Sequence, residues 1–563
     1  MGRVSSAEVP AQLHEHYYLH NFLSLCASVE KQYDDFLSDQ ECDFLRCFYA
    51  LDRAAQCLYV RLISRVGPWF RLHKLNYPEI GELAKPMQRL VKEGLVVEAS
   101  GLCVDELGRL FTRQELHRAY GTLLSGPRST SKAGLIESIE QLPMDEMQHL
   151  KQVTETVGDE LRAPVCVDRV ELLQLLFFGN RHQGLTDFVL SDLGLARHYP
   201  YPLNPQHRLF SCRQALEEYL ACCELQDVFY QCLEVDDEEG MDGVAMLMLE
   251  SETCFAVNQH RWQRAWNTVA RELERRGKLE LAVQLYQRSD RHPARERRAR
   301  ILEGLENWRG VVALCEDILA APWCEAEQEA ATKILARAKR KLGAGPKRRA
   351  PDKFQEITIV LTRSGERVER DAQLHFQGQW HTAHYVENSL MNTLFGLAFW
   401  EQIFADVPGA FYNAYQGVPK DMYESGFAAR RAQGITRRLD ELRSADLHDV
   451  LMDAYKRYEG YQCHWTDWRT VDENLLSTAL TIIPARDLFA IWERLLFDPA
   501  ENRSGFPDLI AFGEQAGEYS MIEVKGPGDA LQNNQKRWLR YFTEHAIPTA
   551  VAWVEWKKEP DDG

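Results

Sequence analysis

Residues 505–525 read GFPDLIAFGEQAGEYSMIEVK, and this stretch decides the fold of the C-terminal part of the chain. Two short apolar segments flank a turn-like connection, which predicts two neighbouring β-strands. Asp508 opens the first strand, and Glu523 and Lys525 close the second. Because successive side chains of a strand point to opposite faces, Glu523 and Lys525 share one face while Val524 turns into the core. A hairpin would make Asp508 and Glu523 neighbours.

These carboxylates predict a site for a divalent metal ion. Together with the backbone carbonyl of Val524, they offer the oxygen ligands that Mg²⁺ and Mn²⁺ prefer. Lys525 would hold an attacking water and neutralise charge on a phosphate. A Glu-x-Lys pair alone is common and can be a surface ion pair worth less than about 1 kcal/mol. The preceding Pro-Asp favours the catalytic interpretation, so Asp508, Glu523 and Lys525 are the candidate catalytic residues.

The segment that follows supplies the rest of an α/β domain. Residues 526–529 read GPGD, which predicts a turn, and residues 531–545 have the periodicity of an amphipathic helix. Residues 548–554 are the next predicted strand, which gives a β-β-α-β order. Gln535 and Lys536 of the predicted helix would lie beside the site, where they could touch a DNA phosphate.

These motifs resemble a known family of nucleases. The residues PDLIAF and MIEVKGPGDALQNNQKRWL are similar to the VRR-NUC form of the PD-(D/E)xK fold, and specifically to the Fanconi-associated nuclease family. Residues 385–404 (YVENSLMNTLFGLAFWEQIF) resemble the helix that carries this family's first acidic metal ligand, and residues 59–97 are similar to its opening domain. The resemblance implies metal ligation by Glu387, Asp508, Glu523 and the Val524 carbonyl.

The same resemblance implies 5′-flap endonuclease and 5′→3′ exonuclease activity on DNA, used in the repair of interstrand crosslinks. Eukaryotic members begin with a ubiquitin-binding zinc finger. Nothing like it is found in this sequence, so ubiquitin-dependent recruitment is not expected. The residues alone predict only phosphodiester hydrolysis. Two alternatives stay open: a junction resolvase, which would need a symmetric dimer, and a DNA-binding repair scaffold with an inactive nuclease fold.

Composition is that of a large intracellular protein with room for several domains. The 563 residues are 45% hydrophobic, and no apolar run approaches the roughly 18 residues that span a bilayer. The 14 cysteines are scattered without a Cys-x-x-Cys pair, which predicts reduced thiols in a reducing compartment. We expect no membrane partner and a monomer. The expected location is the cytoplasm or nucleoid if the protein is bacterial, and the nucleus if it is eukaryotic.

The net charge of −18 argues at first against a nucleic-acid partner, yet DNA binding depends on local basic patches. Two such clusters, within 291–300 and 333–353, precede the predicted nuclease domain. Each alone is more simply a solvated helix face. The two together favour phosphate contact with branched or flap DNA. The candidate contacts are Arg295, Arg298, Lys339, Arg340 and Lys341.

The predicted fold class is a mostly α, multidomain chain with a C-terminal α/β nuclease domain. Residues 1–105 predict a helical, winged-helix-like domain, in which a helix pair within 79–93 is interrupted at Pro86. Residues 106–145 resemble a SAP module, a DNA-backbone binder. Its second helix would open at Ser129 or Ser131. Its candidate phosphate contacts are Arg128 and Lys132.

Residues 146–248 predict a helical domain, and residues 249–350 predict TPR-like helical repeats. In the latter, Leu285 and Leu314 take equivalent positions only 29 residues apart. Tetratricopeptide repeats usually have a period of 34, so a plain helical bundle is the alternative.

Residues 351–563 predict the nuclease domain, with a helical insertion at about 405–500. Within it, residues 356–361 predict a strand and residues 387–404 a helix. His381, His384 and Glu387 are spaced so as to suggest a zinc site. We reject that interpretation, because polar residues and Gly378 weaken a continuous helix before Glu387.

Overall fold

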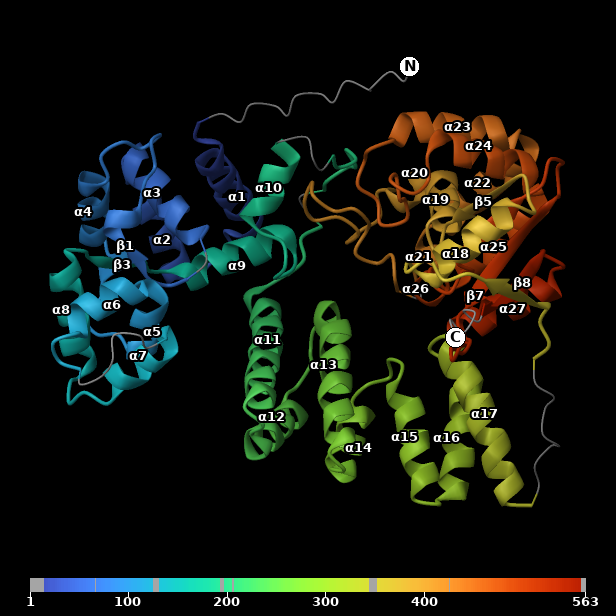
Figure 1. Ribbon diagram of the computed structural model, residues 1–563, viewed down its shortest axis with the longest axis horizontal. Helices are drawn as coiled ribbons and strands as arrows, with labels where there is room; N and C mark the ends of the chain where they lie inside the picture. Colours follow the sequence, from blue (N-terminus) through green and yellow to red (C-terminus); the bar gives the residue numbers. More distant parts are fainter. Residues whose placement is uncertain are drawn as a thin grey trace, which may run out of the picture. The chain divides into compact units, whose positions relative to one another are not determined.

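The structure is a computed structural model whose described residues form two compact units, divided in the sequence between Ala196 and Arg197 (Figure 1). The first unit is mostly helical, and the second contains helical hairpins and a five-stranded sheet. This confirms the predicted fold class. The described residues are 15–65, 67–124, 131–192, 197–204, 207–343, 352–424 and 426–557.

The first unit packs its helices around a small antiparallel sheet with the strand order β1–β3–β2. The strands are β1 (Phe70–Arg71), β2 (Val96–Glu98) and β3 (Leu161–Pro164). Strand β3 was not predicted. It lies in the range assigned to the helical domain 146–248, yet it pairs with both strands of the range 1–105. The helices are α1 (Tyr17–Tyr33), α2 (Asp39–Tyr49), α3 (Arg53–Ile63), α4 (Ala84–Lys92), α5 (Val104–Leu110), α6 (Arg113–Tyr120), α7 (Lys132–Glu140), α8 (Glu146–Val157), α9 (Val167–Phe178) and α10 (Leu185–Asp192).

The helix pair predicted within 79–93 is wrong. The structure has one helix there, α4, and Pro86 lies in its first turn. Proline is tolerated in that turn because the first N–H groups of a helix have no partner within the helix. The predicted start of the second SAP-like helix at Ser131 is confirmed. The Ser131 side chain accepts a hydrogen bond from the backbone N–H of Gly134 at 3.2 Å.

Arg71 joins the small sheet to its helices through two carboxylates. Its guanidinium donates to both oxygens of Glu115, at 2.7 and 2.9 Å, and to Asp159 at 2.7 Å. The Arg71 side chain is only 6% exposed. Hydrogen bonds from Arg71 lower the pKa of Glu115 to about 2, which shows that this carboxylate is held ionised.

We expect Arg71→Met to lower the free energy of unfolding of the first unit by about 3–5 kcal/mol. The change leaves two carboxylates without their buried partner. Urea unfolding of the whole protein measures the loss. Arg46→Met is the matched control, because Arg46 pairs with Asp43 on the surface, where such pairs contribute less than about 1 kcal/mol. Equal unfolding midpoints for the two variants would contradict the structural role of Arg71.

The second unit begins with paired helices that form a connector (green in Figure 1). Within the range 249–350, for which TPR-like repeats are predicted, residues 265–286 and 295–319 lie in the helix pairs α13–α14 and α15–α16. Whether they are tetratricopeptide repeats stays a prediction. The helices are α11 (Arg213–Glu234), α12 (Glu238–Glu250), α13 (Ala256–Arg275), α14 (Leu279–Gln287), α15 (Ala294–Gly304), α16 (Trp308–Ala320) and α17 (Glu325–Lys341).

The nuclease sheet has the strand order β4–β8–β7–β6–β5. Strands β4, β8 and β7 are parallel, whereas β7, β6 and β5 are antiparallel. The predicted strand at 356–361 is confirmed as β4. The strands are β4 (Glu356–Leu361), β5 (Thr382–Tyr385), β6 (Leu509–Phe512), β7 (Tyr519–Lys525) and β8 (Thr549–Trp556).

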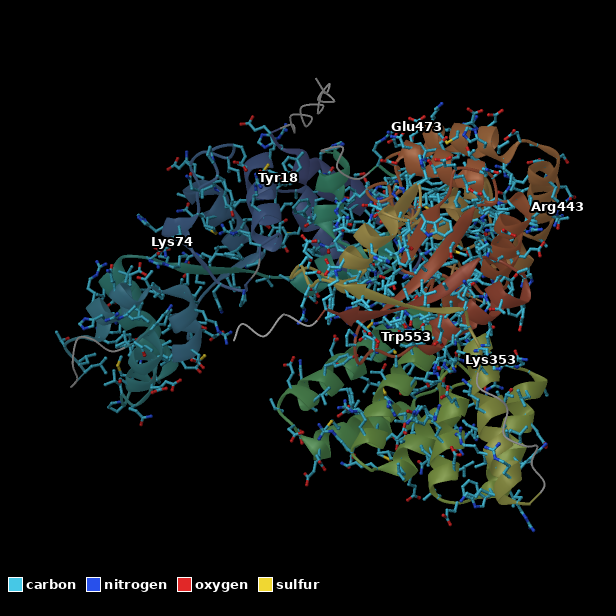
Figure 2. All side chains as sticks on the ribbon, turned by 45° about the vertical axis from the view of Figure 1, so that its right-hand side comes forward. Tyr18, Lys74, Lys353, Arg443, Glu473 and Trp553 are labelled. Atoms are coloured by element: carbon cyan, nitrogen blue, oxygen red, sulfur yellow. The ribbon has the colours of Figure 1, made fainter. Side chains whose placement is uncertain are left out.

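Helices cover both faces of this sheet. Leu509 and Ala511 of β6 pack with α18 on one face, whereas Ile510 and Phe512 join a larger core on the other face. Strand β6 is therefore apolar at every position, as expected for a strand buried on both sides. Figure 2 shows how densely side chains fill this domain, with Trp553 marking β8. The range 405–500, for which a helical insertion is predicted, contains helices α21 to α25. The helices are α18 (Val368–Gln377), α19 (Leu390–Ala398), α20 (Trp400–Ile403), α21 (Phe427–Arg430), α22 (Ala432–Ser444), α23 (Leu447–Tyr458), α24 (Glu473–Ile482), α25 (Ala485–Phe497), α26 (Pro499–Asn502) and α27 (Asn533–Glu544).

Within the described residues, we find no single helix that is both long and apolar enough to cross a membrane. Helices α24 and α25 are long and apolar enough only when they are taken together, and the chain bends by 109° between them. Their apolar residues, including Leu476 and Trp492, belong to the core beside the sheet. None of the 14 cysteines, all of which lie in the described residues, is paired in a disulfide.

Candidate metal centre

The hairpin of β6 and β7 brings Asp508 beside Glu523, as the sequence predicted. Leu509 pairs with Ile522, so Asp508 lies at the next position of the ladder. Asp508 Oδ2 accepts a hydrogen bond from the backbone N–H of Val524 at 2.8 Å. Because the N–H and C=O of one strand residue point to the same side, the Val524 carbonyl also faces this edge. The backbone of Val524 is thus placed next to the Asp508 carboxylate.

Glu523 and Lys525 share one face of β7, again as predicted. Ile522 and Val524 belong to the core on the opposite face. Lys525 Nζ lies 2.8 Å from Glu523 Oε1, and Gln535 Nε2 of α27 donates to the same oxygen at 2.6 Å. Glu523 is fully buried. Its other oxygen, Oε2, is buried and has no hydrogen-bond partner among the described residues.

Glu387 lies in a turn, and the prediction that it belongs to a helix is wrong. Strand β5 ends at Tyr385 and helix α19 begins only at Leu390, so the Glu387 side chain is presented from the connection. The ladder with β6 continues through Val386, whose N–H donates to the carbonyl of Asp508 at 2.9 Å. Tyr385 Oη donates to Glu387 Oε2 at 2.7 Å. The pairing of β5 with β6 therefore places Glu387 beside Asp508, although 120 positions lie between them in the sequence.

Both buried carboxylates are costly to ionise. Burial raises the pKa of Asp508 to about 6. The hydrogen bond from the N–H of Val524 lowers this pKa, whereas the negative charge of Glu387 raises it further. Burial raises the pKa of Glu523 to about 8, and the charge of Asp508 adds to it, although Lys525 partly offsets the effect. Carboxylates that repel one another away from water need a cation.

The donor set fits a hard divalent ion. The observation that supports this fit is the Oε2 atom of Glu523, which is buried and has no hydrogen-bond partner among the described residues. Such buried oxygens are rare in folded proteins, and a bound cation would satisfy this one. Within the described ranges, no group of three or more His, Cys, Asp or Glu is already placed to hold a metal ion. Glu387 is exposed, so it and the Val524 carbonyl would complete the set formed by Asp508 and Glu523. His384 lies on β5 and His381 precedes it, which removes the helical spacing of the rejected zinc interpretation.

The candidate DNA contacts of the connector are only partly available. Arg295 donates to both oxygens of the buried Glu327, so it has a structural role that the sequence did not reveal. Lys339 pairs with Glu316 at 2.8 Å, and Lys341 lies 5.6 Å from the centre of the Trp308 ring. Arg298 and Arg340 form no ion pair with described residues. Part of each basic cluster therefore stabilises the helical connector itself.

Of the other predicted DNA contacts, one has a structural role, two are partly exposed and one lies outside the described residues. Gln535 donates to Glu523, so it orients a carboxylate; its predicted contact with DNA stays a prediction. Lys536 is partly exposed on the same turn of α27, and Lys132 is partly exposed at the start of α7. Arg128 lies outside the described residues. No sequence signal identified the contact of Gln535 with Glu523, because it depends on how α27 packs on β7.

The sequence placed Arg291 in a basic cluster, but it did not reveal the other cations that lie around it, Arg264 and Lys420. Burial lowers the pKa of Arg291, and the charge of Arg264 lowers it further. Burial likewise lowers the pKa of His260, where Glu424 acts in the opposite direction, and the charges of Arg291 and Lys420 lower it further. Arg291 forms no ion pair among the residues that the structure describes. Mutually repelling cations of this kind favour an anionic ligand.

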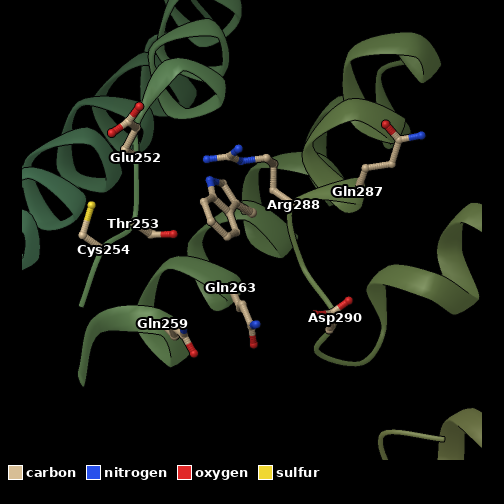
Figure 3. A pocket seen from close by; sticks show the side chains of 9 residues that line it. Glu252, Thr253, Cys254, Gln259, Gln263, Gln287, Arg288 and Asp290 are labelled. Carbon is tan, nitrogen blue, oxygen red and sulfur yellow. The ribbon is translucent and has the colours of Figure 1, made fainter. Parts of the chain in front are cut away.

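A separate hollow of about 600 Å³ lies in the connector (Figure 3). Arg288 lies 5.2 Å from the centre of the Trp266 ring and donates to the carbonyl of Ser251 at 2.6 Å. The lining contains none of the predicted metal ligands, and its acidic residues do not favour a phosphate. It consists of Glu252, Thr253, Cys254, Gln259, Gln263, Trp266, Gln287, Arg288 and Asp290.

Comparison with known proteins agrees with this site. Residues 16–97 match the family described as "FAN1, HTH domain", and residues 442–556 match the VRR-NUC domain. The Fanconi-associated nuclease 1 homolog of Pseudomonas aeruginosa is 33% identical over 97% of both chains. The homolog of Arabidopsis thaliana is 26% identical over 95% of this chain and 67% of its own.

A solved structure is also similar along almost the whole chain. The crystal structure of paFAN1 bound to 5′-flap DNA with a two-nucleotide flap has a TM-score of 0.88 and 33% identity. The match covers 98% of this chain and 100% of that one. With a third of its residues identical to a relative of nearly the same extent, the chain belongs to the Fanconi-associated nuclease family.

Proposed function

We propose that this DNA-repair nuclease cuts 5′ flaps and degrades DNA from the 5′ end, and that it does so in the repair of interstrand crosslinks. A nuclease of this family depends on a divalent metal ion, and we propose Mg²⁺ or Mn²⁺ for this chain. The single observation that carries the site is the buried pair of carboxylates, Asp508 and Glu523. The Oε2 atom of Glu523 has no hydrogen-bond partner among the described residues. Support for the flap comes from the similar structures, which hold 5′-flap DNA.

The proposed chemistry assigns one role to each residue. Asp508, Glu523, the Val524 carbonyl and Glu387 would hold the ion. A bound divalent ion supplies a Lewis acid for the phosphate and lowers the pKa of a coordinated water. Lys525 is held 2.8 Å from Glu523, which orients its side chain toward the place where a phosphate oxygen or the attacking water would lie. Gln535 of helix α27 orients the Glu523 carboxylate through its hydrogen bond to Oε1.

The cations around Arg291 are the proposed binding site for a 5′-terminal phosphate. They include Arg264 and Arg291, and the charge of Glu501 of α26, shortly before Asp508 in the chain, also acts on Arg291. Arginine provides a planar set of donors that suits a phosphate dianion. This assignment replaces the predicted role of Arg295, which is occupied by Glu327. A terminal phosphate bound there would select a 5′ end.

The basic segment at the end of α17 gives a testable salt dependence. We expect reversal of Lys339, Arg340 and Lys341 to Glu to weaken binding to every DNA structure. The slope of log K against log salt should fall by about 0.9 for each DNA phosphate that the variant no longer neutralises. Fluorescence anisotropy between low and physiological salt measures it. An unchanged slope would mean that the segment is a solvated helix face. The matched control, with the same change in net charge, reverses Arg271, Arg275 and Arg309.

Partner and location are proposed together with the reaction. We propose a monomer acting on flap or branched DNA, in the cytoplasm or nucleoid of a bacterium or the nucleus of a eukaryote. A junction resolvase would have to be a symmetric dimer that cuts both strands of a four-way junction. Sedimentation of the protein with and without flap DNA, followed by digestion of flap and junction substrates, tests this. A stable dimer that prefers junctions would favour the resolvase.

A further inference from the structure

Asn388 follows the proposed ligand Glu387 and bonds to the segment that leads into Asp508. Its Oδ1 accepts hydrogen bonds from the backbone N–H groups of Gly505 at 2.9 Å and Phe506 at 3.2 Å. Its Nδ2 donates to Glu387 Oε1 at 3.3 Å. One side chain thus contacts both segments that present the metal ligands, and it contacts them outside the β5–β6 ladder.

The backbone of Asn388 is in the left-handed region, with φ of 54°. Few residues other than glycine adopt this conformation readily, and asparagine is among the best of them. Asparagine also offers an acceptor with two lone pairs and a donor on the same group. Aspartate keeps the acceptor but not the donor, and glycine keeps only the backbone conformation. The position therefore uses each property of the amide side chain.

The Gly505 segment is fixed from its other side as well. Gly505 has φ of +93°, and a Cβ at this position would lie 2.8 Å from the backbone carbon of Asn534 in the first turn of α27. Asn392 of α19 donates to the carbonyls of Asn388 at 2.6 Å and Arg503 at 2.8 Å. The segment before Asp508 is thus held between α27, whose Gln535 contacts Glu523, and the turn that carries Glu387.

We infer that Asn388 is a positioning residue that sets the placement of Glu387 relative to Asp508 and so the affinity of the metal centre. The inference deepens the proposed function and rests on it. The inference assigns Asn388 no contact with the substrate. Residues that orient metal ligands typically change metal affinity or activity by about 10–100-fold when replaced.

The decisive variant is Asn388→Gly, which keeps the left-handed backbone and removes the side chain. We expect its affinity for Mn²⁺, measured by isothermal titration without DNA, to fall by about 10–100-fold. Cleavage should fail at low Mn²⁺ and recover at saturating Mn²⁺, with an unchanged KM for flap DNA. Asn388→Asp retains both acceptor bonds and should lose much less affinity. Wild-type Mn²⁺ affinity in Asn388→Gly would overturn the inference.

Two further variants keep the test decisive. Glu306→Gly is the matched control, because Glu306 is exposed, lies between α15 and α16 and has φ of 56°, so it probes the backbone conformation alone. It should bind Mn²⁺ as the wild type does. If Asn388→Gly fails to fold, Asn392→Ala removes the bonds to the carbonyls of Asn388 and Arg503, which join the same two segments, and should shift Mn²⁺ affinity in the same direction. No shift in Asn392→Ala would then overturn the inference.

The same experiment separates this inference from the proposed function. Asp508→Asn is assayed in parallel for cleavage at saturating Mn²⁺. If Asp508→Asn remains fully active, the proposed site fails, whatever the Asn388 variants do. If Asp508→Asn is inactive and Asn388→Gly binds Mn²⁺ normally, only the role of Asn388 fails.

Discussion

Asp508→Asn and Glu523→Gln are each expected to lower the rate of flap cleavage by about 10³-fold in Mg²⁺ or Mn²⁺. Both changes keep the shape of the side chain and remove one charge from the proposed metal ligands. Affinity for flap DNA should stay within a few-fold, because the site stabilises the transition state more than it binds the ground state. Single-turnover cleavage of a labelled flap measures the rate, and anisotropy in metal-free buffer measures the affinity.

The matched control is Glu514→Gln in the connection between β6 and β7. Glu514 is exposed and lies outside the site, so the variant makes the same chemical change in the same hairpin with no expected effect on rate. Melting curves of all three variants in metal-free buffer establish that they are folded. Full activity in either Asp508→Asn or Glu523→Gln would remove that residue from the proposed metal centre.

Arg291→Gln is expected to abolish the preference for a phosphorylated 5′ end. The wild type should cut a short 5′ flap faster when its end carries a phosphate, and it should cut a 3′ flap or intact duplex poorly. Removing Arg291 takes away a cation that has no ion pair among the described residues, so the loss should fall on the phosphorylated flap alone. Side-by-side digestion of 5′-phosphorylated 5′-flap, 5′-hydroxyl 5′-flap and 3′-flap substrates measures it.

The control for this prediction is Arg288→Gln, a neighbouring arginine that lies over Trp266 and bonds to Ser251. It should leave the preference for the phosphate intact. Equal rates of the wild type on 5′ and 3′ flaps would contradict the polarity and favour a resolvase. A phosphate preference that survives in Arg291→Gln would move the terminal-phosphate site elsewhere.

The sheet and the core of the site could be predicted because their signals are local. Strand alternation placed Glu523 and Lys525 on one face, and the hairpin placed Asp508 beside them. The helix α27 and strand β8 followed from periodicity within 40 residues of the same motif. The position of Glu387 relative to Asp508 came only from family resemblance, because 120 positions separate the two residues.

What could not be predicted depends on contacts between distant segments. Strand β3 is four residues long, and only its pairing with β1 and β2 distinguishes it from a loop. Arg295 looked like a surface cation in the sequence, but its partner Glu327 lies on another helix and is buried. Glu387 was predicted to lie in a helix over 387–404, a segment that resembles the helix carrying the family's first acidic metal ligand. The structure starts that helix three residues later, since Asn388 takes a left-handed backbone conformation.

A crystal structure with 5′-flap DNA and Ca²⁺ tests the central claim most directly, because Ca²⁺ can occupy an oxygen-ligand site while supporting little hydrolysis. The account predicts an ion bound by Asp508, Glu523 and the Val524 carbonyl at about 2.3–2.6 Å. The scissile phosphate should lie against the same ion and Lys525. An ion held by other residues, or a flap whose scissile phosphate lies away from Asp508 and Glu523, would contradict it.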